Sequence, residues 1–265
     1  MDPVRDKYYI EEMRKQAKED AAIKRRLRGL KRKMERNEAD RCKNQNKVLK
    51  MIDEIKTLAC AIPPNVKDLY EKEILMWIEE DAFSYETHNF HAMLDEVRKQ
   101  PFMTFVGVPG SGKSVTIRHI ALILKKEGYE IVPIRDVRKI EDYCDARIGQ
   151  VFVIDDMVGV VGLNKQKFES LIDNKKIISN PDNKGTKVLM SCRKTVFYEC
   201  PKSFFSNEKN LVKLYSPLNT LNDDDKQEIL QRHGLSRDLI SPEMLQETSD
   251  MFPLLCNLFS KKEKK

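Results

Sequence analysis

Residues 102–126 read FMTFVGVPGSGKSVTIRHIALILKK and are the most informative stretch of the chain. Within it, residues 107–114 match the pattern GxxxxGK[ST] at every fixed position. The apolar run Met103–Val106 precedes the pattern, and apolar side chains at helical spacing follow it through 115–126. A glycine-rich loop between a strand and a helix directs backbone N–H groups at phosphate oxygens, and the helix adds the positive end of its dipole. The sequence therefore predicts a phosphate-binding loop.

This loop supplies most of the candidate nucleotide contacts. We expect Lys113 to reach the β- and γ-phosphates of ATP or ADP, and the Ser114 hydroxyl to bind Mg²⁺. The other expected contacts come from Gly107, Val108, Pro109, Gly110, Ser111, Gly112 and Val115.

A second acidic motif follows the apolar run Val151–Ile154. Carboxylates at the carboxyl end of a buried parallel strand lie at the sheet edge where ligands bind in such folds. We expect Asp155 to hold Mg²⁺, directly or through water. Asp156 is the candidate catalytic residue that orients or deprotonates the attacking water. The alternative for both residues is a helix cap at the end of a buried strand.

Five short apolar runs alternate with stretches long enough for a helix. The runs are Met103–Val106, Glu130–Pro133, Val151–Ile154, Lys187–Met190 and Leu211–Leu214. This alternation is typical of a parallel sheet with helices on both faces. The predicted fold class is therefore α/β, a P-loop NTPase with a five-stranded parallel sheet flanked by helices.

A guanine-nucleotide site is an alternative that the sequence makes less favourable. Residues 156–159 match DxxG, and residues 164–167 begin like the guanine-reading NKxD. The last position of that second motif is Lys167, where an aspartate should accept the guanine protons. We therefore expect ATP to be preferred over GTP.

Residues 1–60 carry the excess positive charge, with 18 Lys and Arg against 11 Asp and Glu. Apolar residues such as Leu27, Leu30 and Met34 recur at 3-4 spacing, which predicts a helical or coiled-coil segment over 1–62 and self-association through it. The run 24–33 holds seven positive charges. A solvated helix face, nucleic-acid binding, an anionic membrane surface and nuclear import are alternative explanations of this run.

Three absences limit the class of protein. No run of 18 apolar residues is present, and residues 1–13 do not have the composition of a secretory signal. The six cysteines form no CxxC pair, which is typical of reduced thiols. We expect a cytoplasmic protein without a membrane span, or a nuclear one if the run 24–33 directs import.

The stretch 83–260 resembles the STAND class of signalling NTPases, relatives of the AAA+ ATPases, and within it the third novel STAND NTPase domain. The resemblance is carried by FVGVPGSGKSVTIRHIALIL, GYEIVPI, QVFVIDDMVG, KVLMSCR and MFPLLCNLFS. It implies a nucleotide-dependent signalling switch with slow Mg²⁺-dependent ATP hydrolysis and a protein partner. Full-length members continue into a winged-helix region and sensor repeats, so a complete chain of this length would lack that sensor.

The resemblance also implies further site residues. Arg193 occupies the position of the sensor arginine that reads the γ-phosphate, a catalytic role. Pro253 resembles the base-contacting proline of the GxP motif, although Met251 replaces its glycine. Residues 83–87 occupy the place where these domains bind adenine, which makes Phe83 and Thr87 candidates.

We therefore expect five parts in the chain. These are the basic helical segment 1–62, a helical lead-in 65–100, the P-loop NTPase core 101–216, a small C-terminal helical subdomain 217–260 and a disordered tail 261–265. Two other functions stay open: a coiled-coil scaffold with structurally bound nucleotide, and a nucleic-acid-dependent ATPase.

Overall fold

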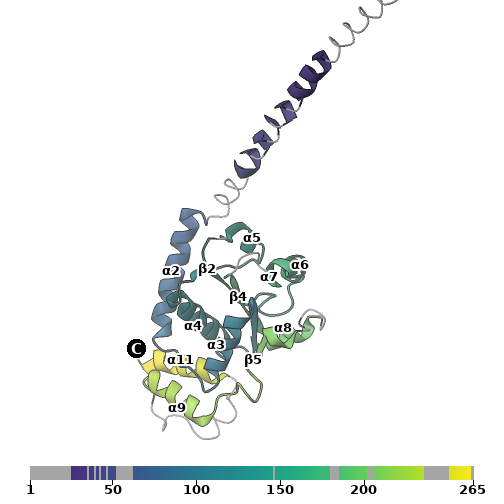
Figure 1. Ribbon diagram of the computed structural model, residues 1–265. Coiled ribbons are helices and arrows are strands. Elements are labelled where there is room, and N and C mark those ends of the chain that lie inside the picture. The colour runs from purple at the N-terminus through teal and green to yellow at the C-terminus, as the bar shows by residue number, and fades with distance from the viewer. Residues whose placement is uncertain are drawn as a thin grey trace, which may run out of the picture. The chain divides into compact units, whose positions relative to one another are not determined.

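The computed structural model describes residues 25–34, 36–38, 40–41, 43–45, 47–51, 62–145, 147–179, 185–201, 205, 207–235 and 251–263. Contacts between residues divide the chain into two units, Met1–Leu58 and Ala59–Lys265. In the first unit the described residues are helical and their side chains are exposed (Figure 1). The predicted helix is confirmed there, whereas residues 1–24 and 52–61 lie outside the described part, and the coiled coil stays a prediction.

The second unit is built on a five-stranded, all-parallel sheet, which confirms the predicted fold class. The strand order is β2-β3-β4-β1-β5. The strands are β1 Phe102–Gly107, β2 Glu130–Pro133, β3 Gln150–Ile154, β4 Lys187–Arg193 and β5 Leu211–Lys213. Every residue of β3 is buried, as expected for a central strand covered on both faces.

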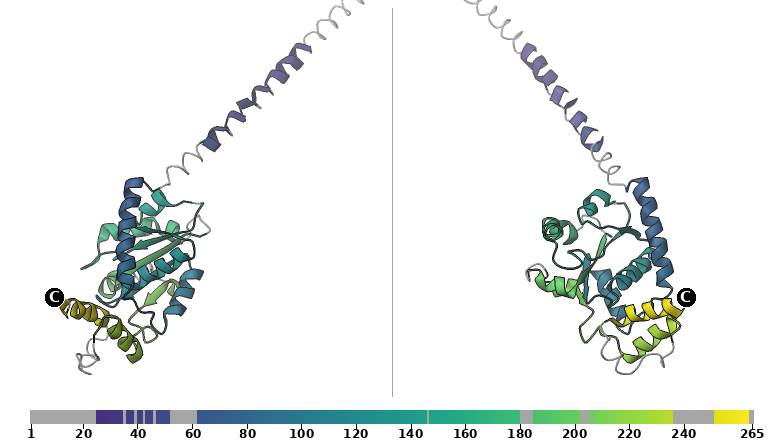
Figure 2. Two further views of the ribbon diagram at one scale, coloured as in Figure 1. Left: turned by 90° about the vertical axis from the view of Figure 1, so that its left-hand side faces the viewer. Right: turned by 180° about the vertical axis from the view of Figure 1, so that it is seen from behind.

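Side chains alternate between two apolar cores because successive strand residues point to opposite faces. Val151 and Val153 enter the core formed with α2 (Pro64–Asp81), α3 (Phe90–Lys99) and α4 (Lys113–Lys126). Phe152 and Ile154 enter the other core. That core includes side chains from α5 (Lys139–Tyr143), α6 (Lys165–Asp173), α7 (Lys175–Ser179) and α8 (Lys194–Glu199). Figure 2 shows helices on both sides of the sheet.

Prolines and caps fix several helix starts. Pro64 is the first residue of α2, where its fixed φ suits a helix and its missing N–H costs nothing. Asn222 and Asp225 form a capping box at the start of α9 (Asp223–Arg232). The 3-10 turn η1 (Glu208–Asn210) leads directly into β5.

Two C-terminal helices, α9 and α11 (Phe252–Glu263), lie side by side in both figures (Figure 1, Figure 2). They share a small apolar core that includes Ile229, Leu230, Phe252 and Cys256. Helix α11 continues to Glu263, past residue 261, where the predicted tail begins. The lysines and the glutamate there are good helix formers that extend an existing helix. In the described part of the chain, no helix is long and apolar enough to cross a membrane.

Candidate functional site

The loop between β1 and α4 has the backbone that its glycines allow. Gly110 has φ 82° and Gly112 has φ 86°, left-handed values that side chains with a Cβ rarely adopt. A Cβ on Gly110 would lie 2.9 Å from Leu254 Cβ, and one on Gly112 would lie 3.9 Å from Pro253 Cγ. The start of α11 therefore packs directly against the phosphate loop.

Lys113 lies inside this loop with only 6% of its surface exposed. Its Nζ donates to the Val108 carbonyl oxygen over 2.8 Å. Burial lowers the pKa of Lys113, while the nearby Asp156 acts in the opposite direction. The Ser111 hydroxyl is also buried in the loop without a hydrogen-bond partner. A buried lysine and a buried hydroxyl without a hydrogen-bond partner are expected in a loop that binds a charged ligand.

Ser114 and Asp155, both predicted as metal ligands, lie together. The Ser114 hydroxyl donates to Asp155 Oδ1 over 2.8 Å. Ser191, at the end of β4, donates to the same oxygen over 2.5 Å, and Arg118 of α4 contacts Oδ2 over 3.4 Å. Mg²⁺ prefers oxygen ligands, and in nucleotide sites it binds protein oxygens such as these together with phosphate oxygens. These residues therefore fit the metal.

Asp156 and Arg193, the two predicted catalytic residues, form an ion pair. Arg193 donates to the Asp156 carboxylate from Nε at 3.2 and 3.3 Å and from Nη2 at 3.1 Å. Strand register places Arg193 opposite Gly107, beside the phosphate loop. Asp156 has φ 45°, and among the described residues it is the only one other than glycine with positive φ. Conformations of this kind are concentrated at functional sites.

A small cavity of about 50 Å³ adjoins the loop on the side of the helical subdomain. Thr87 and Pro253 both line it, together with Val108 and Ser111 of the phosphate loop. Two of the three residues expected at the base are therefore brought together. Phe83 is not among the lining residues, and its ring stacks on His233 with centroids 5.7 Å apart. The base-binding roles of all three stay predictions.

His88 ties the loop after α2 to the helical subdomain. Its Nδ1 lies 2.7 Å from Asp225 Oδ2 and its Nε2 lies 3.1 Å from the Leu218 carbonyl oxygen. Both partners accept hydrogen bonds, so the protonated imidazole satisfies both. The hydrogen bond to Asp225 raises the pKa of His88 above its usual value. His88 follows Thr87, which lines the small cavity.

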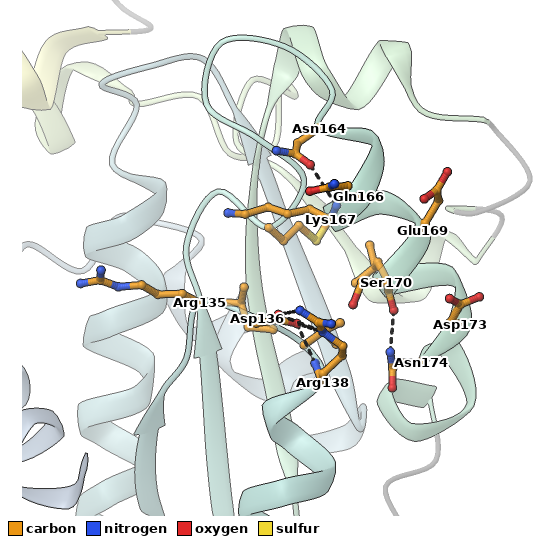
Figure 3. A pocket seen from close by; sticks show the side chains of 14 residues that line it. Arg135, Asp136, Arg138, Asn164, Gln166, Lys167, Glu169, Ser170, Asp173 and Asn174 are labelled. Carbon is orange, nitrogen blue, oxygen red and sulfur yellow. Dashed lines mark hydrogen bonds and ion pairs between the residues drawn. The ribbon is translucent and has the colours of Figure 1, made fainter. Parts of the chain in front are cut away.

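A larger polar pocket of about 580 Å³ lies between the loop after β2, the end of β3 and α6. Figure 3 shows Lys167 and Ser170 of α6 facing Asp136 and Arg138 of that loop. Among the described residues, none from the phosphate loop lines it. Asn164 caps α6, since its side chain accepts from Lys167 N over 3.0 Å. The segment that resembles a guanine motif therefore starts a helix.

Sequence reasoning missed Ser191, Arg118 and the larger pocket. Arg118 had a usable signal, because it follows Ser114 by one helical turn and so shares its face of α4. Ser191 had none, since a serine in a buried strand is not distinctive by itself. Among the described residues, no group of three or more His, Cys, Asp or Glu side chains could hold a metal ion.

Two solved structures are similar in fold. The RuvB Holliday junction branch migration motor of Thermotoga maritima is 15% identical with a TM-score of 0.42, covering 68% of this chain and 64% of its own. A Walker-type ATPase of Pyrococcus abyssi is 11% identical with a TM-score of 0.38, covering 65% of each chain. This chain therefore spans somewhat less than two thirds of the length of either structure.

The sequence comparisons give a more specific answer. No curated protein matches the chain. The family model of novel STAND NTPase 3 matches residues 85–235, which is more than half of the 265 residues. This match spans the phosphate loop, the acidic strand end and Arg193. The chain belongs to the novel STAND NTPase 3 family.

Proposed function

We propose that the chain is a nucleotide-dependent signalling switch that binds ATP with Mg²⁺ and hydrolyses it slowly. One observation carries this proposal: Leu254 and Pro253, at the start of α11, pack on the two left-handed glycines of the phosphate loop. A loop that rearranges around phosphates would move these contacts. The helical subdomain would then report which nucleotide is bound.

The site residues have distinct roles in this proposal. Lys113 would bind the β- and γ-phosphates, and Ser114 and Asp155 would hold Mg²⁺. The metal would neutralise charge on the phosphates. Asp156 would orient the attacking water or accept its proton. Arg193 would turn from Asp156 to the γ-phosphate.

The ion pair between Asp156 and Arg193 supports slow hydrolysis. Both oxygens of Asp156 accept from Arg193. In this proposal Arg193 must leave Asp156 to reach the γ-phosphate, so the pair separates before each turnover. That requirement adds a conformational step to the chemistry.

We also propose the domain organisation expected from the sequence, with the core over 101–216, the helical lead-in over 65–100 and the subdomain over 217–260. Adenine is the proposed base, with Thr87, Pro253 and Phe83 as candidate contacts. A protein partner would receive the signal. The cytoplasm is the proposed location, with nuclear import through the run 24–33 as the alternative.

A second candidate function rests on the N-terminal segment. Leu27, Leu30 and Met34 are 55–66% exposed on one described helix, at 3-4 spacing. If self-association through this face is the main activity, the chain is a scaffold and the nucleotide is a structural ligand. A nucleic-acid-dependent ATPase would instead use the basic run on the same segment.

Hydrogen exchange tests the switch. Amide protection in α9 and α11 should differ between the full chain saturated with Mg–ADP and with a non-hydrolysable Mg–ATP analogue. Equal protection in both states would contradict a switch. Turnover with and without added DNA or RNA then separates the alternatives, since stimulation favours the nucleic-acid-dependent ATPase and undetectable turnover favours the scaffold.

A further inference from the structure

Arg118 reaches the candidate metal site from the same helix that carries Ser114. The two residues are one turn apart on α4 and so share a face. They contact opposite oxygens of the Asp155 carboxylate: Ser114 donates to Oδ1 over 2.8 Å and Arg118 Nη2 lies 3.4 Å from Oδ2. The carboxylate is therefore held from both ends by α4.

The Arg118 guanidinium is itself held in place. Nη1 donates to Glu80 Oε2 of α2 over 2.9 Å. The guanidinium carbon lies 5.2 Å from the centroid of the Trp77 ring, within the range of a cation–π contact. Only 27% of the side chain is exposed. A planar group that the Trp77 ring and Glu80 already fix loses little further freedom when it orients Asp155.

The plane of an aspartate carboxylate is only weakly fixed by its own torsion preference. Ser114 and Ser191 both donate to Oδ1, and Arg118 is the contact at the other oxygen, Oδ2, so it completes the set that fixes the plane. Asp155 Oδ1 and the Ser114 hydroxyl are the two oxygens proposed to meet the metal. Hydrogen-bond partners behind a metal-binding carboxylate commonly change metal affinity 10–100-fold when they are removed. The contacts of Arg118 match that role.

We propose that Arg118 is a positioning residue of the magnesium site, acting through Asp155 and anchored by Glu80 and Trp77. The proposal rests on the proposed function, because it requires Asp155 to hold Mg²⁺. It extends the metal site from α4 to α2. Charge alone gives the opposite role, in which the guanidinium competes with the cation. The two roles predict opposite changes in metal affinity when Arg118 is replaced.

The test compares three variants of the full chain with the wild type. Arg118→Met removes the guanidinium but keeps an unbranched stem over Trp77. Arg118→Lys keeps a positive charge but cannot bridge Asp155 and Glu80. Its Mn²⁺ affinity should therefore lie between those of the wild type and Arg118→Met. Arg98→Met is the matched control, because Arg98 also joins two carboxylates, Asp95 and Glu127, but belongs to α3.

Two readouts separate positioning from general damage to the fold. Mn²⁺ binding in the presence of ATP is measured by electron paramagnetic resonance, and ATP affinity in EDTA is measured by calorimetry. Arg118→Met should weaken Mn²⁺ binding by about 10–100-fold and leave ATP affinity in EDTA unchanged. Arg98→Met should change neither. Unchanged or tighter Mn²⁺ binding in Arg118→Met would overturn the proposal.

If Arg118→Met does not fold, Glu80→Met carries the test, because it removes the acceptor that holds Arg118 Nη1 at an exposed position. It should weaken Mn²⁺ binding in the same direction by a smaller factor, and no change would overturn the proposal. A wild-type chain that binds ATP but no Mn²⁺ would instead overturn the proposed metal site itself. If only the role of Arg118 is wrong, the wild type binds Mn²⁺ and Arg118→Met binds it equally well.

Discussion

Arg193 and Asp156 join the ends of β4 and β3 through an ion pair with a shortest distance of 3.1 Å between Nη2 and Oδ2. Both residues were expected to act on the γ-phosphate or on the attacking water. The structure shows them acting on each other, beside the first glycine of the phosphate loop. A nucleotide that recruits Arg193 would therefore release Asp156 in the same step.

Replacing the arginine should remove the discrimination between ATP and ADP. Arg193→Ala should bind ADP normally, lose its preference for ATP and hydrolyse ATP about 10²–10³-fold more slowly, since a charged group aimed at the reacting phosphate is absent. Affinities for both nucleotides and single-turnover rates measure this. Lys194→Ala, a neighbouring cation that lies over the Tyr215 ring, is the control. An unchanged ATP-to-ADP affinity ratio in Arg193→Ala would contradict the sensor role.

The two adjacent aspartates should separate metal binding from chemistry. Asp155→Asn should weaken the Mg²⁺-dependent part of ATP affinity, because a hard anionic ligand is lost. Asp156→Asn should bind Mg–ATP normally and hydrolyse it about 10²–10⁴-fold more slowly, as expected when a general base is removed. Titration calorimetry and turnover assays check both. Wild-type binding and hydrolysis in both variants would mean that neither residue has its proposed role.

The contact between His88 and Asp225 should make stability depend on pH. The pKa of His88 is raised in the folded state by its hydrogen bond to Asp225, so the stabilisation is complete below the unfolded-state value of about 6.5 and is lost as pH rises through the higher folded-state value. His88→Asn keeps a donor toward Asp225 but cannot carry the charge.

Thermal melting of both proteins across this pH range measures the effect. The difference in melting temperature between wild type and His88→Asn should be larger at about pH 6 than at about pH 9. A difference that is the same at both pH values would show that the charge of His88 contributes nothing.

The N-terminal segment should self-associate through its apolar face. Lys and Arg repel one another there and salt screens them, so association of the nuclease-treated full chain should strengthen with salt. Bridging by nucleic acid predicts the reverse, because counterion release drives it. Sedimentation at low and high salt distinguishes the two, with Leu27→Asp/Leu30→Asp as the control. A monomer at every salt concentration would leave this segment a solvated charged helix.

The sheet and the phosphate loop could be predicted because their signals are local. Each strand is a short apolar run, and the loop is defined by glycines, a lysine and a serine at fixed spacing. The apolar strand ending in two aspartates likewise indicated that Asp155 lies beside the phosphate loop, where it accepts a hydrogen bond from Ser114.

Contacts between distant side chains could not be predicted in the same way. The interaction of Arg118 with Glu80 depends on how α2 crosses α4, and the pair of Arg193 with Asp156 depends on strand register. Helix ends were also uncertain where nothing stops the helix, as the extension of α11 to Glu263 shows. Helices α6 and α7 both lie between β3 and β4, in a stretch for which the sequence pattern predicted one helix.

The central claim is that this chain binds ATP through its phosphate loop. The direct measurement is calorimetric titration of Mg–ATP and Mg–GTP into the wild type, Lys113→Ala and Lys187→Met, with a melting curve for each. Lys187 is a matched control, since it is also a buried lysine with a lowered pKa, but its Nζ donates to the carbonyl oxygens of Arg98 and Gln100. The account predicts that the wild type binds Mg–ATP more tightly than Mg–GTP, that folded Lys113→Ala has almost no affinity for either, and that Lys187→Met binds as the wild type does. Unchanged ATP affinity in a folded Lys113→Ala would contradict it.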